Sequence, residues 1–177
     1  MTTDQLIQLF IPIIQTGLTN AGFTSTQILQ SFQPTDLGAF DGSVVYFYKL
    51  GDYRYGFSQM EAYWDTNTSQ MIESEVQRYE TSFQITAWNG VPSLTQNVTS
   101  DIINTVAATL QSQYCVTTLE AAGVGILRVT NIRNENFVDD RDRFNFAPSF
   151  DFTLTHKVLN TSVIQPSSEF IPGIYPI

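Results

Sequence analysis

The sequence predicts an α+β fold: a mostly antiparallel sheet with two main helices packed on one face and extended arms. Three observations lead to this prediction. A chain of 177 residues can bury one sizeable core. Segments of helical period and segments of alternating polarity follow one another in the order helix, strands, helix, strands. No internal repeat divides them, so we expect a single domain over residues 1–159 and an extended C-terminal arm over residues 160–177.

Residues 2–20 are predicted to form the first helix. Thr2 and Gln5 fit a capping box, in which each side chain accepts a hydrogen bond from the backbone of the other residue. Pro12 cannot donate to the carbonyl of Gln8, so we expect it to kink or divide the helix. The apolar positions form one stripe at three- and four-residue spacing: Leu6, Leu9, Phe10, Ile13 and Ile14.

The first strands are predicted between residues 26 and 64. Residues 26–33 form a short strand, and the loop 34–42 follows it. Residues 43–50 are apolar at both alternating sets of positions, which is typical of a central strand covered on both faces. Gly51-Asp52 predicts a tight turn, after which residues 53–64 should pair back as a hairpin.

A long strand is predicted after the turn at residues 65–69. Residues 70–88 contain neither Gly nor Pro and exceed an ordinary strand in length. We therefore expect either a bend near residues 78–80 or a hairpin arm that projects from the body of the protein.

The second helix is predicted over residues 99–113. Thr99 or Ser100 should cap it, and Asp101 should lie in its first turn. Its buried stripe consists of Ile102, Ile103, Val106 and Leu110. Residues 117–122 are expected to add one further helical turn.

The last strands are predicted over residues 124–131 and 149–158, with a polar loop over residues 134–144 between them. The arm that follows has three prolines but many apolar residues. So apolar a segment should lie across its own domain or reach a neighbour. The candidate contact residues in it are Phe170, Ile171 and Tyr175.

The sequence contains few groups suited to catalysis. Cys115 is the one cysteine, so we expect no intrachain disulfide and no thiolate metal site, and a buried thiol. His156 is the one histidine, expected at the end of a strand in a structural hydrogen bond. No nucleophile elbow, phosphate-binding loop or dinucleotide fingerprint is present. We predict that the protein is not an enzyme, with no catalytic residue, no cofactor and no metal.

A dense charge cluster lies in the predicted loop, and its members are Asp139, Asp140, Arg141, Asp142 and Arg143. Three carboxylates suit a divalent cation, but interleaved arginines weaken cation binding. The same arginines suit bidentate pairing with carboxylates, either within the chain or on a neighbouring subunit. We single out Asp139, Asp140, Arg141 and Arg143 as candidate interface residues, with Glu73, Glu75 and Glu80 as candidate partner carboxylates.

Charge and composition narrow the class of partner. Charged residues make up 14% of the chain, against about 25% in an average domain. A surface with few ions suits broad, permanent protein contacts, although a secreted β-rich protein has a similar composition. The net charge of −9 argues against a protein that grips DNA, yet a negative channel lets DNA pass without binding. With no basic N-terminal segment and no long apolar run, we expect neither a signal peptide nor a membrane span.

Residues 81–158 resemble the neck proteins of tailed bacteriophages described as tail terminator or gateway proteins. Three segments carry the resemblance: TSFQITAWNG at 81–90, SDIINTVAATLQS at 100–112, and GVGILRVTNIRNENFVDDRDRFNFAPSFDFTLTHK at 123–157. The resemblance implies a structural subunit of the virion, made in the host cytoplasm, that forms a ring, most often a hexamer. Such a ring joins the portal and adaptor proteins to the tail tube, sheath or nozzle proteins. It caps the tail tube, and the genome passes through its lumen.

Two alternatives stay open at this point, one within the structural proteins and one from another class. A head-completion adaptor, often a twelvefold ring, is also a neck protein but is commonly more helical than this chain. A phage-encoded hydrolase or carbohydrate-binding module would need a concave aromatic site. The sequence does not assemble Trp64, Trp88 and the tyrosines into one.

Overall fold

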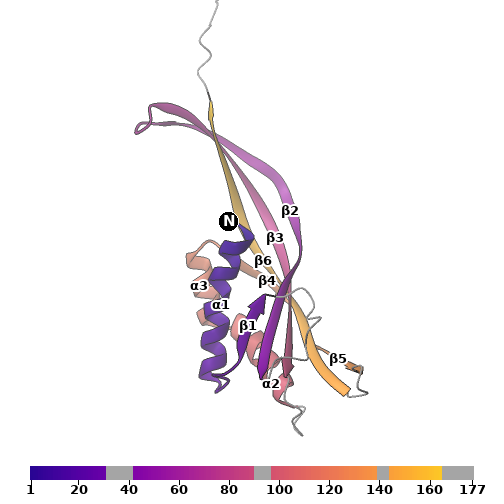
Figure 1. The fold of residues 1–177 in the computed structure, drawn as a ribbon. Coiled ribbons are helices and arrows are strands. Elements are labelled where there is room, and N and C mark those ends of the chain that lie inside the picture. The colour runs from indigo at the N-terminus through magenta and orange to yellow at the C-terminus, as the bar shows by residue number, and fades with distance from the viewer. Residues whose placement is uncertain (31–41, 90–96, 139–143, 165–177) are drawn as a thin grey trace, which may run out of the picture.

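The computed structural model describes residues 1–30, 42–89, 97–138 and 144–164. These residues form one six-stranded sheet and three helices that cover one face of it (Figure 1). The predicted α+β class, with a mostly antiparallel sheet, is confirmed. In chain order the elements are α1 (Thr3–Asn20), β1 (Gln27–Gln30), β2 (Ser43–Asp65), β3 (Gln70–Asn89), α2 (Asn97–Leu110), α3 (Gln113–Ala121), β4 (Gly125–Val129), β5 (Arg133–Val138) and β6 (Phe144–Ile164).

The strand order is β1-β2-β3-β6-β4, and β5 also pairs with β6. β1 runs parallel to β2, and every other pairing is antiparallel. β6 is paired on both edges: one edge pairs with β3 from Ser149 to Ile164, while the other edge pairs with β5 and then β4. This strand is therefore hydrogen-bonded to β3, β4 and β5.

Helix α1 begins with the capping box that the sequence predicts. The Thr2 hydroxyl accepts from the Gln5 amide, and the Gln5 side chain accepts from the Thr2 amide at 2.8 Å. The helix runs without interruption past Pro12, so Pro12 does not divide it, and that part of the expectation is wrong. Pro12 and Gln8 both lie on the exposed side, where water can hydrate the carbonyl that loses its partner.

The core lies between the helices and one face of the sheet. Phe10 of α1 is fully buried and packs edge-on against three rings, with centroids at 5.3 Å from Phe47, 5.2 Å from Phe83 and 5.4 Å from Phe152. These three rings come from β2, β3 and β6. Edge-to-face contacts of aromatic rings add stability beyond the area they bury. Phe10 therefore fixes α1 to the three central strands at one point.

β2 departs from the prediction at its middle. Gly51-Asp52 does not form a turn, and β2 and β3 pair as one long hairpin from Ser43 with Asn89 to Asp65 with Gln70. Two register shifts, at Lys49/Gly51 and at Tyr55/Gln59, absorb the extra residues as bulges. Gly56 has a φ of +71° in the second bulge, a conformation that glycine adopts without strain.

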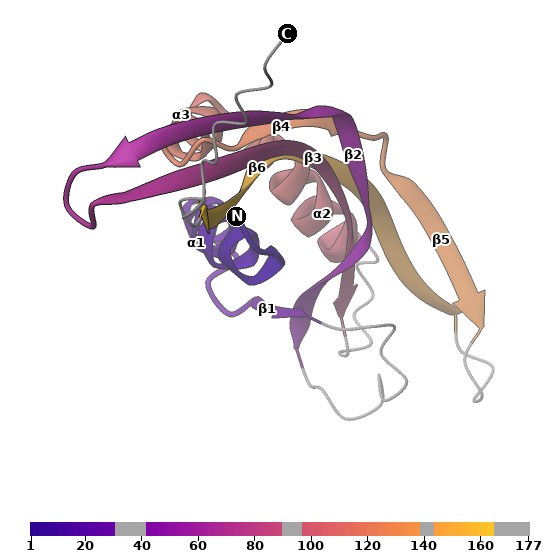
Figure 2. The same ribbon diagram turned by 90° about the horizontal axis from the view of Figure 1, so that it is seen from above.

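The far part of the β2–β3 hairpin forms an arm, which confirms one of the two expectations for residues 70–88. With the end of β6 alongside, it extends beyond the helices (Figures 1 and 2). Core residues on the strands stop at Phe83 on β3 and Leu154 on β6. The arm is therefore a three-stranded ribbon that none of the described helices covers.

Other boundaries differ from the sequence-based expectations. Of residues 134–144, predicted as a polar loop, residues 134–138 belong to β5 and Phe144 begins β6, because hydrogen bonding to a long neighbour overrides their low strand propensity. β6 also continues through Ile164, so the first residues of the predicted C-terminal arm belong to this strand.

α2 begins at Asn97, which places the expected caps Thr99 and Ser100 inside the helix and leaves Asp101 outside its first turn. α3 is longer than the one turn predicted.

Replacing Phe10 by alanine should cost about 3–5 kcal/mol of unfolding free energy, because a fully buried ring is lost and three partners face a cavity. Chemical denaturation followed by circular dichroism measures this change. Leu9→Ala is the matched control, since Leu9 is only partly buried on the same helix. Equal losses for the two variants would contradict the anchoring role of Phe10.

Candidate functional site

The contact residues predicted from the sequence lie outside the described residues. Those in the charge cluster fall within 139–143, and those in the C-terminal arm fall within 165–177. The segment 139–143 joins Val138 of β5 to Phe144 of β6, which are paired residues at the end of a hairpin. The contact role of these residues stays a prediction. They are Asp139, Asp140, Arg141, Arg143, Phe170, Ile171 and Tyr175.

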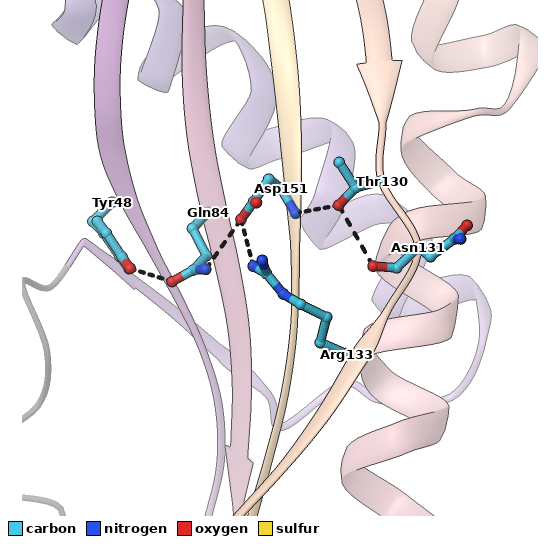
Figure 3. A network of polar contacts seen from close by, with 6 residues as sticks. All are labelled: Tyr48, Gln84, Thr130, Asn131, Arg133 and Asp151. Atoms are coloured by element: carbon cyan, nitrogen blue, oxygen red, sulfur yellow. Dashed lines mark hydrogen bonds and ion pairs between the residues drawn. The ribbon is translucent and has the colours of Figure 1, made fainter.

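A polar ladder crosses the face of the sheet that the helices leave open (Figure 3). The Tyr48 hydroxyl donates to Oε1 of Gln84, whose Nε2 donates to Oδ1 of Asp151 at 3.0 Å. The same Oδ1 accepts from Nη2 of Arg133 at 2.8 Å. Thr130 closes the ladder, because its hydroxyl accepts from the Asp151 amide at 2.8 Å. The ladder therefore ties together β2, β3, β6 and the segment that leads into β5.

This ladder is suited to contact and not to catalysis. It contains one carboxylate and one guanidinium that are paired with each other, and its side chains are partly exposed. A face of this kind can meet a partner without removing water from an unpaired ion. Sequence reasoning missed it, although the alternation of Gln84 and Asp151 with buried phenylalanines placed both residues on one polar face.

A second polar cluster lies on the helix side, where the body meets the arm. The Thr81 hydroxyl donates to Oδ1 of Asp52 at 2.7 Å and lies 2.9 Å from Nε2 of His156. Lys49 pairs with Asp52 and also donates to the Thr3 hydroxyl at 2.9 Å. The cluster thus joins β2, β3 and β6 to the start of α1.

The hydrogen bonds fix how His156 is protonated. A hydroxyl has one hydrogen, and Thr81 gives it to the Asp52 carboxylate, which only accepts. Nε2 of His156 must therefore be the donor to Thr81. Burial raises the pKa of Asp52, but hydrogen bonds from Lys49 and Thr81 and the Lys49 charge outweigh it, so this pKa lies below its ordinary value.

His156 has a structural role, as the sequence predicts, but lies within β6 and not at its end. Burial is the largest cause that lowers its pKa, and the charge of the N-terminus acts in the same direction. These effects outweigh the backbone of Lys157 and the Asp52 carboxylate, which raise the pKa. The His156 ring also stacks on Tyr79, with centroids 5.9 Å apart.

Cys115 is fully buried in the core, as the sequence predicts. Burial raises the pKa of its thiol to about 11, so the thiol is protonated at neutral pH and is a poor nucleophile. Among the described residues, no group of three or more His, Cys, Asp or Glu side chains gathers as metal ligands. In the same part of the chain, no helix combines the length and the apolar character needed to cross a membrane.

The arm carries most of the exposed apolar side chains among the described residues. Phe57 is 100% exposed, and Trp64 and Tyr63 are 59% and 50% exposed. Monomeric proteins rarely leave such surfaces open, so an exposed apolar ribbon indicates a contact with another chain. The unbroken length of residues 70–88 was the sequence signal for this arm, but periodicity could not show which side chains stay uncovered.

The fold and these surfaces define a protein that works through contacts with other chains, in the class of structural assembly proteins. The comparisons with known proteins agree with this class. A family model described as E217 gateway protein gp29 matches residues 5–165, which is 161 of the 177 residues. The chain belongs to this family of phage gateway proteins and thus has a structural role in the phage neck. No curated protein matches the chain.

The stability of the protein should fall as the pH drops below the ordinary His pKa of about 6.5. The folded state holds His156 neutral, so the unfolded chain binds a proton more readily, and the loss levels off below the lowered folded-state pKa. His156→Gln keeps a donor for Thr81 but cannot titrate. Denaturation midpoints measured between about pH 7.5 and about pH 5.5 should fall more for the wild type than for this variant. Equal falls would refute the role assigned to His156.

Proposed function

We propose that this chain forms a closed ring, a hexamer, at the junction of the phage head and tail. The match to the gateway family over residues 5–165 carries the proposal. Two features of the fold support it. The arm leaves large apolar side chains uncovered in a single copy, and the two charged side chains of the polar ladder are paired with each other. Both features are expected of a subunit that other chains cover.

In this proposal the ring joins the portal and adaptor proteins on one side to the tail tube, sheath or nozzle proteins on the other. It caps the tail tube and lets the genome pass through its lumen. The net charge of −9, with eight Lys and Arg in the chain, supports passage without binding, since a negative wall repels phosphates.

The purified protein should form closed rings with six times the 19.9 kDa mass of one chain. Mass photometry measures the mass, and negative-stain microscopy shows whether the rings are closed. A mass of twelve chains would favour a head-completion adaptor instead. A protein that is monomeric in solution and absent from purified virions would overturn the proposed function.

Reversing the charges of Arg141 and Arg143 should abolish ring assembly while the variant stays folded. The physical reason is that carboxylates of a neighbouring subunit would then face carboxylates. Ring mass and circular dichroism report the two properties separately. The matched control is Arg78→Glu with Lys157→Glu, which reverses two exposed charges at paired positions of β3 and β6. Rings of unchanged stability in Arg141→Glu with Arg143→Glu would remove these residues from the interface.

A further inference from the structure

The outer part of the arm is built unlike the rest of the sheet. We define the distal arm as residues 59–65 of β2, 70–76 of β3 and 159–164 of β6, which pair in register. Near its tip one cross-strand row contains Tyr63, Ile72 and Val163, and the next row contains Trp64, Met71 and Ile164. Adjacent rows of a sheet point to opposite faces. The distal arm therefore presents apolar side chains on both faces.

All charged side chains of the distal arm are negative. It contains four carboxylates and neither Lys nor Arg: Glu61, Asp65, Glu73 and Glu75. An apolar ribbon that carries these carboxylates complements a surface that offers apolar contact together with positive charge.

A surface of that kind is present on the body of the same chain. β4 pairs with β6 along one edge, and no described strand pairs with its other edge. Leu127 is 56% exposed and Arg128 is exposed on this strand. Residues 125–134 contain Arg128 and Arg133 but no carboxylate. Arg133 is already paired with Asp151, so Arg128 is the cation available to a partner. We call Leu127 and Arg128 the β4 edge.

We propose that the distal arm of one copy docks on the β4 edge of a second copy of this chain. The inference rests on the proposed ring and names the contact that builds it. The two surfaces differ and lie on separate parts of one chain, so the association is head-to-tail, the type that closes into rings. In the arm, no described strand pairs with the outer edge of β2, which β1 contacts only in the body. No described strand pairs there with the outer edge of β6, which β4 contacts only in the body. A strand of another chain can therefore add to either edge.

The apolar part of the contact is tested by replacing Tyr63 and Trp64 together with serine. This variant should weaken ring assembly by at least about tenfold, measured as the concentration at which rings dissociate in mass photometry. Tyr114→Ser is the matched control, because Tyr114 is 56% exposed on α3 and belongs neither to the distal arm nor to the β4 edge. Circular dichroism confirms that both variants are folded.

The charged part is tested by Glu75→Lys on the distal arm and Arg128→Glu on the β4 edge. Each should weaken assembly by about tenfold and more strongly at low salt, because each places like charges together. Glu120→Lys, an exposed position on α3, makes the same change as Glu75→Lys and should assemble normally.

Site-directed crosslinking identifies the partner directly. Ala62→Cys places a thiol on the distal arm, and Leu127→Cys places one on the β4 edge, with every charge kept. The buried Cys115 should contribute little background. A mixture of the two variants, one of them tagged, should give crosslinked dimers with a short bis-maleimide. Ala62→Cys alone, or mixed with Glu120→Cys, should give none.

The outcomes separate this inference from the proposed ring. Wild-type rings together with normal assembly of the arm variants and no mixed crosslink would overturn the docking contact and leave the ring in place. Arm variants that form normal rings but yield virions without tails would show that the arm contacts a different virion protein, which also overturns it. A wild-type protein without rings would overturn both.

Discussion

The contact of Phe10 with three strands is the constraint on which the rest of the structure depends. One ring on α1 meets Phe47, Phe83 and Phe152, so a single helix position fixes β2, β3 and β6 side by side. Because side chains alternate along a strand, burying these phenylalanines turns their neighbours to the other face. Gln84 and Asp151 are such neighbours, and the polar ladder on the open face follows from the packing of the core.

The interactions that hold the strands together differ between the body and the arm. In the body, apolar side chains under the helices hold them. Where the body meets the arm, the buried Thr81 and His156, together with the exposed Asp52, form a polar cluster in place of that core, and Lys49 links the cluster to the start of α1. Beyond this point backbone pairing connects the strands, the Gln77 side chain adds hydrogen bonds to the carbonyls of Tyr55 and Gly56, and the bulge at Tyr55/Gln59 increases the twist. The hydrophobic core thus lies at one end of the sheet, and the strands at the other end are exposed and available for contact.

The sequence predicted the features that depend on neighbours along the chain. The capping box at Thr2, the apolar stripe of α1 (buried except for the partly buried Leu9) and the burial of Cys115 are local or compositional properties, and the structure confirms them. Features that depend on pairing across the sheet were misjudged. Gly51-Asp52 has the composition of a turn, but a bulge keeps it in the ladder with β3, and residues 133–138 become a strand because β6 lies beside them. The polar ladder joins residues far apart in sequence, which periodicity cannot bring together. The predicted contact residues at 139–143 and 165–177 lie outside the described residues.

β6 gives this protein a mechanical property. The strand is continuous from the hairpin with β5, through the core at Phe150 and Phe152, to the distal arm at Ile164. Its backbone is hydrogen-bonded to β3 over most of that length, so a pull on the arm acts on the ladder in shear, with many bonds loaded at once. In a ring whose subunits meet at the distal arm and at the β4 edge, load would pass from the arm along β6 to its middle and then across the β6–β4 pairing. The weakest links would then be the contacts between subunits, and the subunits themselves would stay folded under strain.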